Sequence, residues 1–152
     1  MIALATKPVL TAAAGDGMVA AARRYAAEIG CRVTIVVVDD QLAPWALVRT
    51  DGADMLTVGL ALGKARLVAA NGMPTAAWRG LAENDPFLGL TIPTALDRLL
   101  DGAVLFGGGY PIRVDGHTIG GIGVSGGSEE QDDAVARIGL TGLPQAEHFT
   151  DD

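Results

Sequence analysis

Apolar residues first recur at helical spacing over residues 11–29. Met18, Ala22 and the other large apolar positions of this segment fall on one face of such a helix. Thr11 is a suitable N-cap, and Gly30 can end the helix. We therefore predict a first helix that packs its apolar face on a core.

A run of β-branched residues follows this helix. Residues 31–38 are apolar without alternation, which is typical of a strand covered on both faces. Residues 45–49 resume an extended pattern, so the two segments should form a hairpin. Asp39 and Asp40 lie at its turn, where we interpret them as turn-forming residues rather than as a pair of acids.

The second predicted helix, residues 54–70, has apolar residues on every side. Only Lys64 and Arg66 carry charge late in the segment. A helix that is apolar all round is buried all round, so one side should face the sheet and the other, most simply, another subunit. The ammonium of Lys64 has apolar helical neighbours. It either snorkels to solvent, pairs with a carboxylate across an interface, or faces a pocket where it binds an anion or transfers a proton.

The segment of residues 71–102 is the least regular part of the chain. Several Gly and Pro pairs, among them Ile92-Pro93, indicate turns. Short helical pieces are expected over residues 76–82 and 94–100. The apolar side chains of this segment are candidates for a lid over a pocket, for core or for a subunit contact.

The last third of the chain predicts a hairpin that leads into a helix. Residues 110–114 and 117–125 have extended patterns on either side of Asp115-Gly116, a strong two-residue turn signal. The return strand is rich in glycine, which allows another backbone or a flat ligand to approach the sheet closely.

A capping box predicts the final helix. Ser128 and Gln131 have the required spacing, and Gly139 can end the helix. Residues 121–126 read G-x-G-x-x-G between strand and helix, the pattern of a dinucleotide site. We reject that interpretation because too few residues follow for a second βα unit, and because the carboxylates within residues 129–133 would repel a pyrophosphate. These carboxylates complement the helix dipole instead.

Composition fits a single soluble domain over residues 1–152, with residues 143–152 as a frayed or partner-contacting tail. Hydrophobic residues make up 49% of the chain and charged residues 19%, which is enough apolar material for one core. The net charge of −7 argues against nucleic acid or an anionic membrane as partner. The first residues do not form a signal peptide, so we expect a cytoplasmic protein. A lone cysteine, Cys31, allows no intramolecular disulfide, and we interpret it as a small buried residue.

These segments together resemble the GlcG/HbpS-like family, the haem-binding, corrinoid-associated domain also found at the C-terminus of PduO-type proteins. The resemblance lies in a Gly-Gly-x-Pro-Ile step at residues 108–112 and an Ile-Gly-x-Ile-Gly-Val-Ser-Gly step at residues 119–126, followed by Gln-Asp at 131–132. Residues 49–53 look like the Arg-x-Asp-Gly-Ala step of the family, and residues 64–65 look like its Lys-Ala helix signature.

The resemblance implies an α+β fold of profilin-like α/β/α layers. Its five-stranded antiparallel sheet would be flanked by helices, and dimers would build an octamer. Residues 41–44 replace the glycines that usually follow the family's aspartates, so this turn should differ in shape. The family implies a small-molecule ligand but leaves the function of a given member open.

Two functions remain open. The first is binding of haem or a related tetrapyrrole, in which the glycines of the return strand, Gly121 and Gly123 among them, admit the ring edge. His117 is then the axial-ligand candidate. Apart from this ligand we expect no structural metal, because residues 1–73 have no cluster of His, Cys and carboxylates at a spacing suggestive of zinc.

The second function is a cofactor-independent lyase, isomerase or hydrolase that acts on a small or aromatic carboxylate. Lys64 and Arg49 would hold the carboxylate, while Tyr110, His117 or Asp39 would move protons.

The glycine-rich hairpin supplies three further candidate ligand-binding residues. Gly108, Gly109 and Ser125 would lie on the wall of the expected pocket. Ser125 has no histidine and acid at a recognisable spacing, so its hydroxyl is interpreted as structural rather than as a nucleophile. His148 lies in the polar C-terminal end, which we expect to fray.

Overall fold

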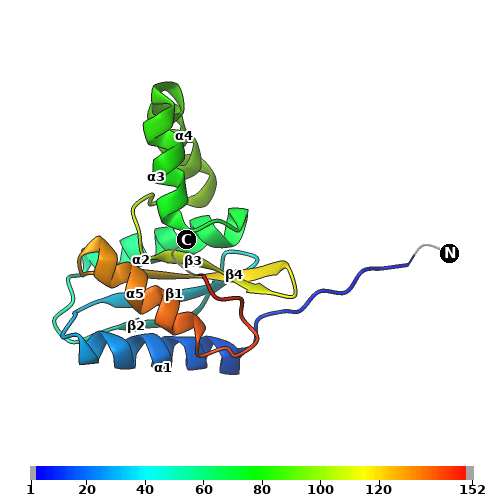
Figure 1. Ribbon diagram of the computed structural model, residues 1–152, viewed down its shortest axis with the longest axis vertical. Coiled ribbons are helices and arrows are strands. Elements are labelled where there is room, and N and C mark those ends of the chain that lie inside the picture. Colours follow the sequence, from blue (N-terminus) through cyan, green and yellow to red (C-terminus); the bar gives the residue numbers. More distant parts are fainter. Residues whose placement is uncertain (1–2, 150–152) are drawn as a thin grey trace.

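The computed structural model describes residues 3–149, which form an antiparallel sheet between two layers of helices (Figure 1). The α+β class predicted above is therefore confirmed. The elements in chain order are α1 Ala12–Glu28, β1 Thr34–Asp39, β2 Pro44–Arg49, α2 Leu56–Asn71, α3 Thr75–Asn84, α4 Pro86–Leu100, β3 Gly109–Val114, β4 His117–Ser125 and α5 Glu129–Leu140.

The sheet has four strands in the order β2-β1-β4-β3, so the expectation of five strands is wrong. The residue patterns themselves supported only four strands, and the fifth came from the family resemblance. Residues 3–10, ahead of α1, are extended but do not pair with the sheet. All three strand pairs are antiparallel, and β1 and β4 form the centre.

Three caps predicted from the sequence are present, two on α1 and one on α5. The Thr11 side chain accepts a hydrogen bond from the Ala14 amide at 3.2 Å, and Ser128 and Gln131 form a complete capping box on α5. Gly30 has a positive φ of 67° just after α1, as its stop role requires. Gly139 does not end α5, because the helix continues to Leu140 and the glycine packs on the core instead.

Helices cover both faces of the sheet. On one face, α1 and α5 pack on side chains such as Ile35 and Ile122. On the other face, α2 packs on Val36 and Val38. Residues 33–38 are all buried, which confirms that β1 is covered on both sides. Each such buried Val or Ile contributes about 1.5–3 kcal/mol of hydrophobic free energy.

The glycines of β4 let α2 lie directly on the sheet. A Cβ at Gly121 would stand 2.3 Å from the Ala65 carbonyl oxygen, and one at Gly123 would stand 2.1 Å from that of Ala61. Real Cβ atoms do not approach a backbone oxygen so closely, so only glycine permits this helix position. The close backbone approach expected from the sequence is made by a helix of the chain itself.

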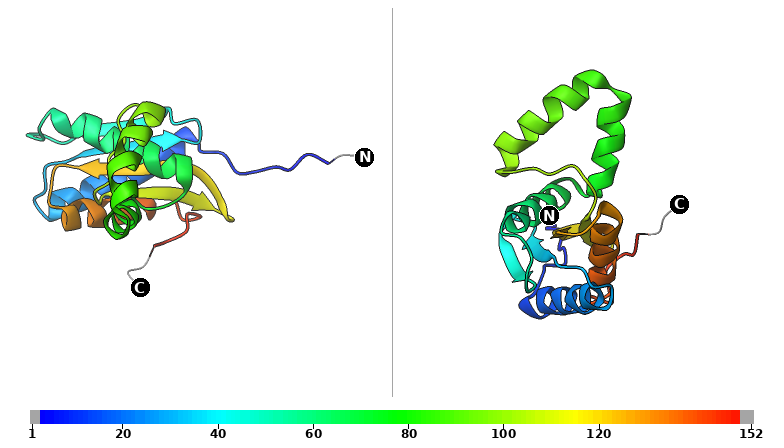
Figure 2. Two further views of the ribbon diagram at one scale, coloured as in Figure 1. Left: turned by 90° about the horizontal axis from the view of Figure 1, so that it is seen from above. Right: turned by 90° about the vertical axis from the view of Figure 1, so that its left-hand side faces the viewer.

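Residues 71–102 form a helical arm that stands away from the layers (Figure 2). The two helices predicted here are present, but α4 is longer than residues 94–100 because it continues through Pro93. The Ile92-Pro93 pair is therefore not a turn: within a helix a proline removes one hydrogen bond, and that loss is tolerated here. No residue of α4 is buried.

Candidate functional site

A buried ion pair joins α2 to α5 beneath the glycine-rich hairpin. The Lys64 Nζ donates hydrogen bonds to Asp132 Oδ2 at 3.0 Å and to the Val124 carbonyl oxygen at 2.7 Å. The side chain of Lys64 is 0% exposed, and that of Asp132 is 4% exposed. Lys64 therefore pairs with a carboxylate, but with one of the same chain and not with one across an interface.

Burial acts on both members of this pair. Burial lowers the pKa of Lys64, and the negative charge of Asp132 opposes that shift. Burial likewise raises the pKa of Asp132, against the attraction of Lys64 and a hydrogen bond from the Gly127 amide. The ring of Phe106 covers the ammonium, with its centroid 4.6 Å from Nζ. The pair is thus sealed by protein atoms.

The loop of residues 107–109 is held by the acidic start of α5 and by α3. The amides of Gly107 and Gly108 donate to Glu129 Oε1 and Asp133 Oδ1 at 2.6 and 2.5 Å, and that of Gly109 donates to the Thr75 hydroxyl at 3.0 Å. The carboxylates at the start of α5 therefore bind backbone and side-chain donors of this chain, in addition to complementing the helix dipole. Such a helix start offers no place for a pyrophosphate.

Gly108 and Gly109 lie against Lys64, so the structure brings these three candidates together. Gly108 has a φ of 107°, and a Cβ there would stand 2.6 Å from the Val124 carbonyl oxygen and 3.0 Å from Lys64 Nζ. A side chain at this position would be strained and would displace the ammonium.

An ion pair between Arg79 of α3 and Glu129 of α5 ties the arm to the body. The hydrogen bond from Arg79 and that from the Gly107 amide lower the pKa of Glu129. Sequence reasoning missed Arg79, Glu129 and Asp132 as partners in this region. The signal that could have found them is the density of carboxylates in the first turn of α5.

The remaining catalytic candidates lie in three other places. Tyr110 belongs to the core on the α1 and α5 face, opposite Lys64, and its ring centroid is 5.4 Å from that of Phe149. His117 is exposed at the first residue of β4. Asp39 ends β1, where its carboxylate accepts hydrogen bonds from the amides of Gln41 and Ala43. This is the turn-forming role interpreted from the sequence.

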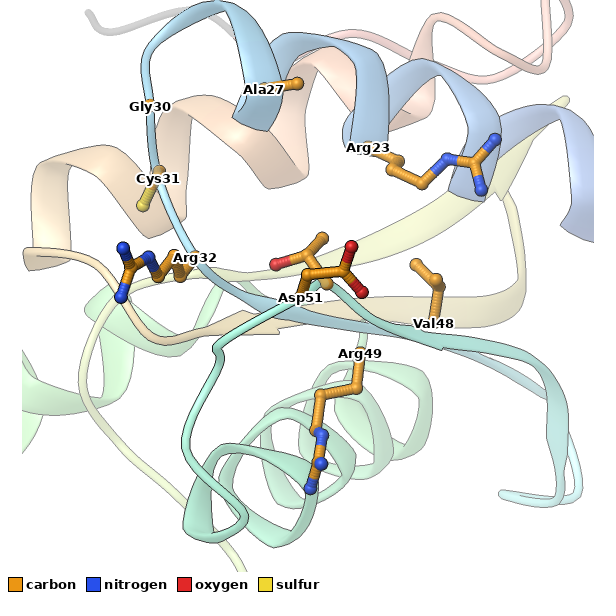
Figure 3. A pocket seen from close by; sticks show the side chains of 9 residues that line it. Arg23, Ala27, Gly30, Cys31, Arg32, Val48, Arg49 and Asp51 are labelled. Carbon is orange, nitrogen blue, oxygen red and sulfur yellow. The ribbon is translucent and has the colours of Figure 1, made fainter.

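Arg49 lies apart from Lys64 as well. It ends β2 at the edge of the sheet and lines a surface hollow with Arg23 and Arg32 (Figure 3). Lys64, Arg49, Tyr110, His117 and Asp39 therefore do not share one site, and the geometry does not assemble the carboxylate-handling enzyme considered above.

The glycine and serine candidates of β4 face α2. The space above Gly121 and Gly123 is filled by the backbone of that helix, which leaves no room there for a flat ring. Ser125 is 3% exposed at the end of β4, opposite Thr34. These three residues have packing roles that require no ligand.

An apolar hollow of about 470 Å³ lies between the start of α2 and the end of α4. Leu56, Leu60 and Val104 line it, together with the carboxylates of Asp97 and Asp101. No histidine among residues 3–149 reaches it. Within the same residues, no three His, Cys, Asp or Glu side chains gather closely enough to hold a metal ion.

The sequence led us to interpret Cys31 as a small buried residue. Cys31 is half-buried, and burial together with the charge of Asp132 raises the pKa of its thiol, which disfavours the thiolate.

None of the helices described here is long and apolar enough to span a bilayer. The predicted tail, residues 143–152, lies partly outside the described residues, but Ala146 is buried and the Glu147 amide donates to the Arg113 carbonyl oxygen.

The chain is similar to known proteins in both sequence and structure. The family described as haem degrading protein HbpS-like matches residues 10–141. A 15.0 kDa protein from the dhaT-dhaS intergenic region of Citrobacter freundii is 33% identical over 132 residues, which cover 86% of this chain and 89% of that protein.

The corrinoid adenosyltransferase PduO of Salmonella typhimurium is 35% identical over 108 residues. That match covers 54% of this chain and 32% of PduO, so the chain spans about a third of this relative. The solved structure of a PduOC:heme complex superposes with a TM-score of 0.81 at 26% identity, and the match covers 94% of this chain and 100% of the other.

Proposed function

We propose that this chain binds haem or a related tetrapyrrole as a homo-oligomer, because it belongs to the family described as haem degrading protein HbpS-like. The family resemblance read from the sequence is confirmed by that membership. The observation that carries the proposal is the similarity to the PduOC:heme complex over the whole of that chain, with a TM-score of 0.81.

The exposed end of β4 fits such a ligand. His117 is exposed. An accessible imidazole nitrogen is a suitable axial ligand for the iron of a bound haem. The end of α2 lies alongside, since a Cβ at Gly72 would stand 3.0 Å from the Thr118 hydroxyl. The side-chain nitrogen of Asn71 is buried there without a hydrogen-bond partner among the described residues.

Asn71 and His117 would then hold different parts of the ligand. A buried amide donor without an acceptor costs about 1–3 kcal/mol, and a haem carboxylate would supply the acceptor. The proposal therefore assigns the iron to His117 and a carboxylate to Asn71. The packed glycines of β4 are not required to admit the ring.

The exposed apolar side chains of the arm support the oligomer. Phe87, Leu90 and Leu99 of α4 are 72%, 76% and 77% exposed. Exposed apolar residues gathered on one element are typical of a protein contact. A second copy of the chain is the occupant that the proposal assigns to this surface.

The absorbance spectrum of the haem complex tests the axial ligand. Wild-type protein should shift the Soret band of added haem, and His117→Ala should abolish or displace that shift. His148→Ala tests the other exposed histidine, which lies near the same turn because Glu147 beside it accepts a hydrogen bond from the Gly116 amide. This variant should keep the shift. A spectrum that is unchanged in His117→Ala contradicts the assignment.

A further inference from the structure

A second hollow, of about 440 Å³, lies at the end of the sheet remote from His117 (Figure 3). Its walls come from the end of α1, from residues 30–32 and from residues 48–51. Because β4 runs from His117 to Ser125, and β1 begins opposite Ser125, this hollow and His117 lie at opposite ends of the central strands.

Positive charge is concentrated in this hollow. Arg23, Arg32 and Arg49 line it, and Asp51 is the single carboxylate among its lining residues. Three guanidiniums against one carboxylate leave two positive charges uncompensated, in a chain whose net charge is −7. The arginines come from three separate segments, α1, the entry to β1 and the end of β2, which the fold brings to one place.

The side chains of these arginines have no hydrogen-bond or ion-pair partner among the described residues. Within residues 3–149, neither they nor Asp51 form an ion pair, although Arg66, Arg79 and other arginines do. Arginines that stabilise a fold are usually engaged by carboxylates or carbonyls, so three unengaged guanidiniums around one hollow are available for a ligand.

The arrangement indicates what such a ligand would look like. Figure 3 shows Arg23 and Arg32 at opposite ends of the hollow and Arg49 on a third side, with their guanidiniums directed outward and Asp51 between them. Ala27 and Val48 supply apolar surface between them. A guanidinium matches carboxylate and phosphate equally well through paired hydrogen bonds. The volume exceeds that of a single inorganic anion.

We propose that this hollow binds a small organic anion with two separated carboxylate or phosphate groups. Arg23 and Arg32 would each pair with one anionic group, and Arg49 would contribute to the field that holds them. Arg49 thus keeps the carboxylate-binding role expected from the sequence, but with Arg23 and Arg32 as its companions in place of Lys64. This site goes beyond the proposed haem function.

Isothermal titration of the full chain at low salt tests the proposal, with succinate as the dicarboxylate probe and phosphoenolpyruvate as the mixed probe. At least one probe should bind, and Arg23→Ala and Arg32→Ala should each weaken it by about tenfold or more, as expected for loss of a charged hydrogen bond. Asp51→Asn should tighten binding, because it removes the carboxylate that opposes the ligand.

Arg24→Ala is the matched control. Arg24 is exposed beside Arg23, forms no ion pair with any residue from 3 to 149 and does not line the hollow, so the variant loses the same charge outside the site. Binding should be unchanged in it. The proposal is overturned if neither probe gives a saturable signal at millimolar concentration, if Arg24→Ala weakens binding as much as Arg23→Ala, or if Asp51→Asn fails to tighten it.

The haem spectrum separates this proposal from the previous one. Arg23→Ala should bind haem as the wild type does, because the hollow lies at the other end of the sheet from His117. Loss of the haem signal in Arg23→Ala would instead mean that the hollow holds haem carboxylates, and would overturn the separate anion site.

Discussion

At the scale of single residues, the most consequential interaction is the buried pair of Lys64 and Asp132. Both side chains are almost completely removed from water, so each depends on the other for compensation of its charge. The sequence marked Lys64 as unusual, but it could not supply the partner, because 68 positions separate the two residues. Only the fold brings the first turn of α5 to Lys64 of α2.

Lys64→Met should therefore destabilise the protein by about 3–5 kcal/mol, because it leaves the carboxylate of Asp132 buried and unpaired. The double variant Lys64→Met with Asp132→Leu should recover most of that loss. Urea unfolding measures both. Arg66→Met on the same helix is the control, since its partner Asp101 is fully exposed and the pair should contribute less than about 1 kcal/mol. Equal losses in Lys64→Met and Arg66→Met would contradict this description.

The pH dependence of stability depends in part on Glu129. Its pKa is lowered in the folded protein, so its contribution is present above the ordinary value of 4.5 and is lost as the pH falls through the lowered folded value. Glu129→Gln should lose less stability than the wild type between neutral pH and about pH 3. Because both side chains of the Arg79 pair are partly exposed, the difference should be below about 1 kcal/mol. Urea unfolding at the two pH values measures the loss of stability in each protein. Equal losses in the wild type and in Glu129→Gln would contradict the prediction.

At the scale of elements, the fit of α2 on β4 organises the sheet. Local patterns were sufficient to predict α1, α2, α5 and all four strands, because each has a helical or alternating apolar pattern, a continuous apolar run or a cap. They were not sufficient for α4, since Pro93 was read as a turn although the helix continues through it. The glycines of β4 indicated a close approach correctly, but a sequence does not say whether a helix or a ligand makes it.

Gly123→Ala tests this packing. Its Cβ would meet the Ala61 carbonyl oxygen at 2.1 Å, so α2 must move and stability should fall by about 2–3 kcal/mol. Gly80→Ala in α3 is the matched substitution, because a Cβ there meets nothing within 4 Å. That variant should be stabilised by about 0.4–1 kcal/mol. Thermal unfolding of both distinguishes the two, and a neutral Gly123→Ala would contradict the packing.

At the scale of the whole molecule, the layered body and the helical arm differ in how much of their apolar surface is buried. The layers of helix and sheet bury their apolar side chains, whereas α4 buries none of its residues. The sequence predicted that the apolar surface of this region could serve as a lid, core or subunit contact, and the placement of the arm away from the body favours the contact. No local pattern encodes the position of the proposed contact between two copies, because that position depends on the direction in which the arm leaves the body.

Leu90→Asp should shift the protein toward a single chain, because Leu90 is 76% exposed and a charge there would be buried in the proposed contact. Analytical ultracentrifugation measures the mass. Ala20→Asp on α1 adds the same charge at another exposed position and should leave the mass unchanged. A wild type that sediments as one chain at all concentrations would contradict the oligomer.

The central claim is that this chain binds haem or a related tetrapyrrole, and an equilibrium titration of the wild-type protein with haem tests it most directly. The absorbance difference against haem in buffer should rise and then saturate, with a Soret band displaced from that of free haem. A difference that rises linearly without saturation, or a spectrum identical to that of free haem, would contradict the claim.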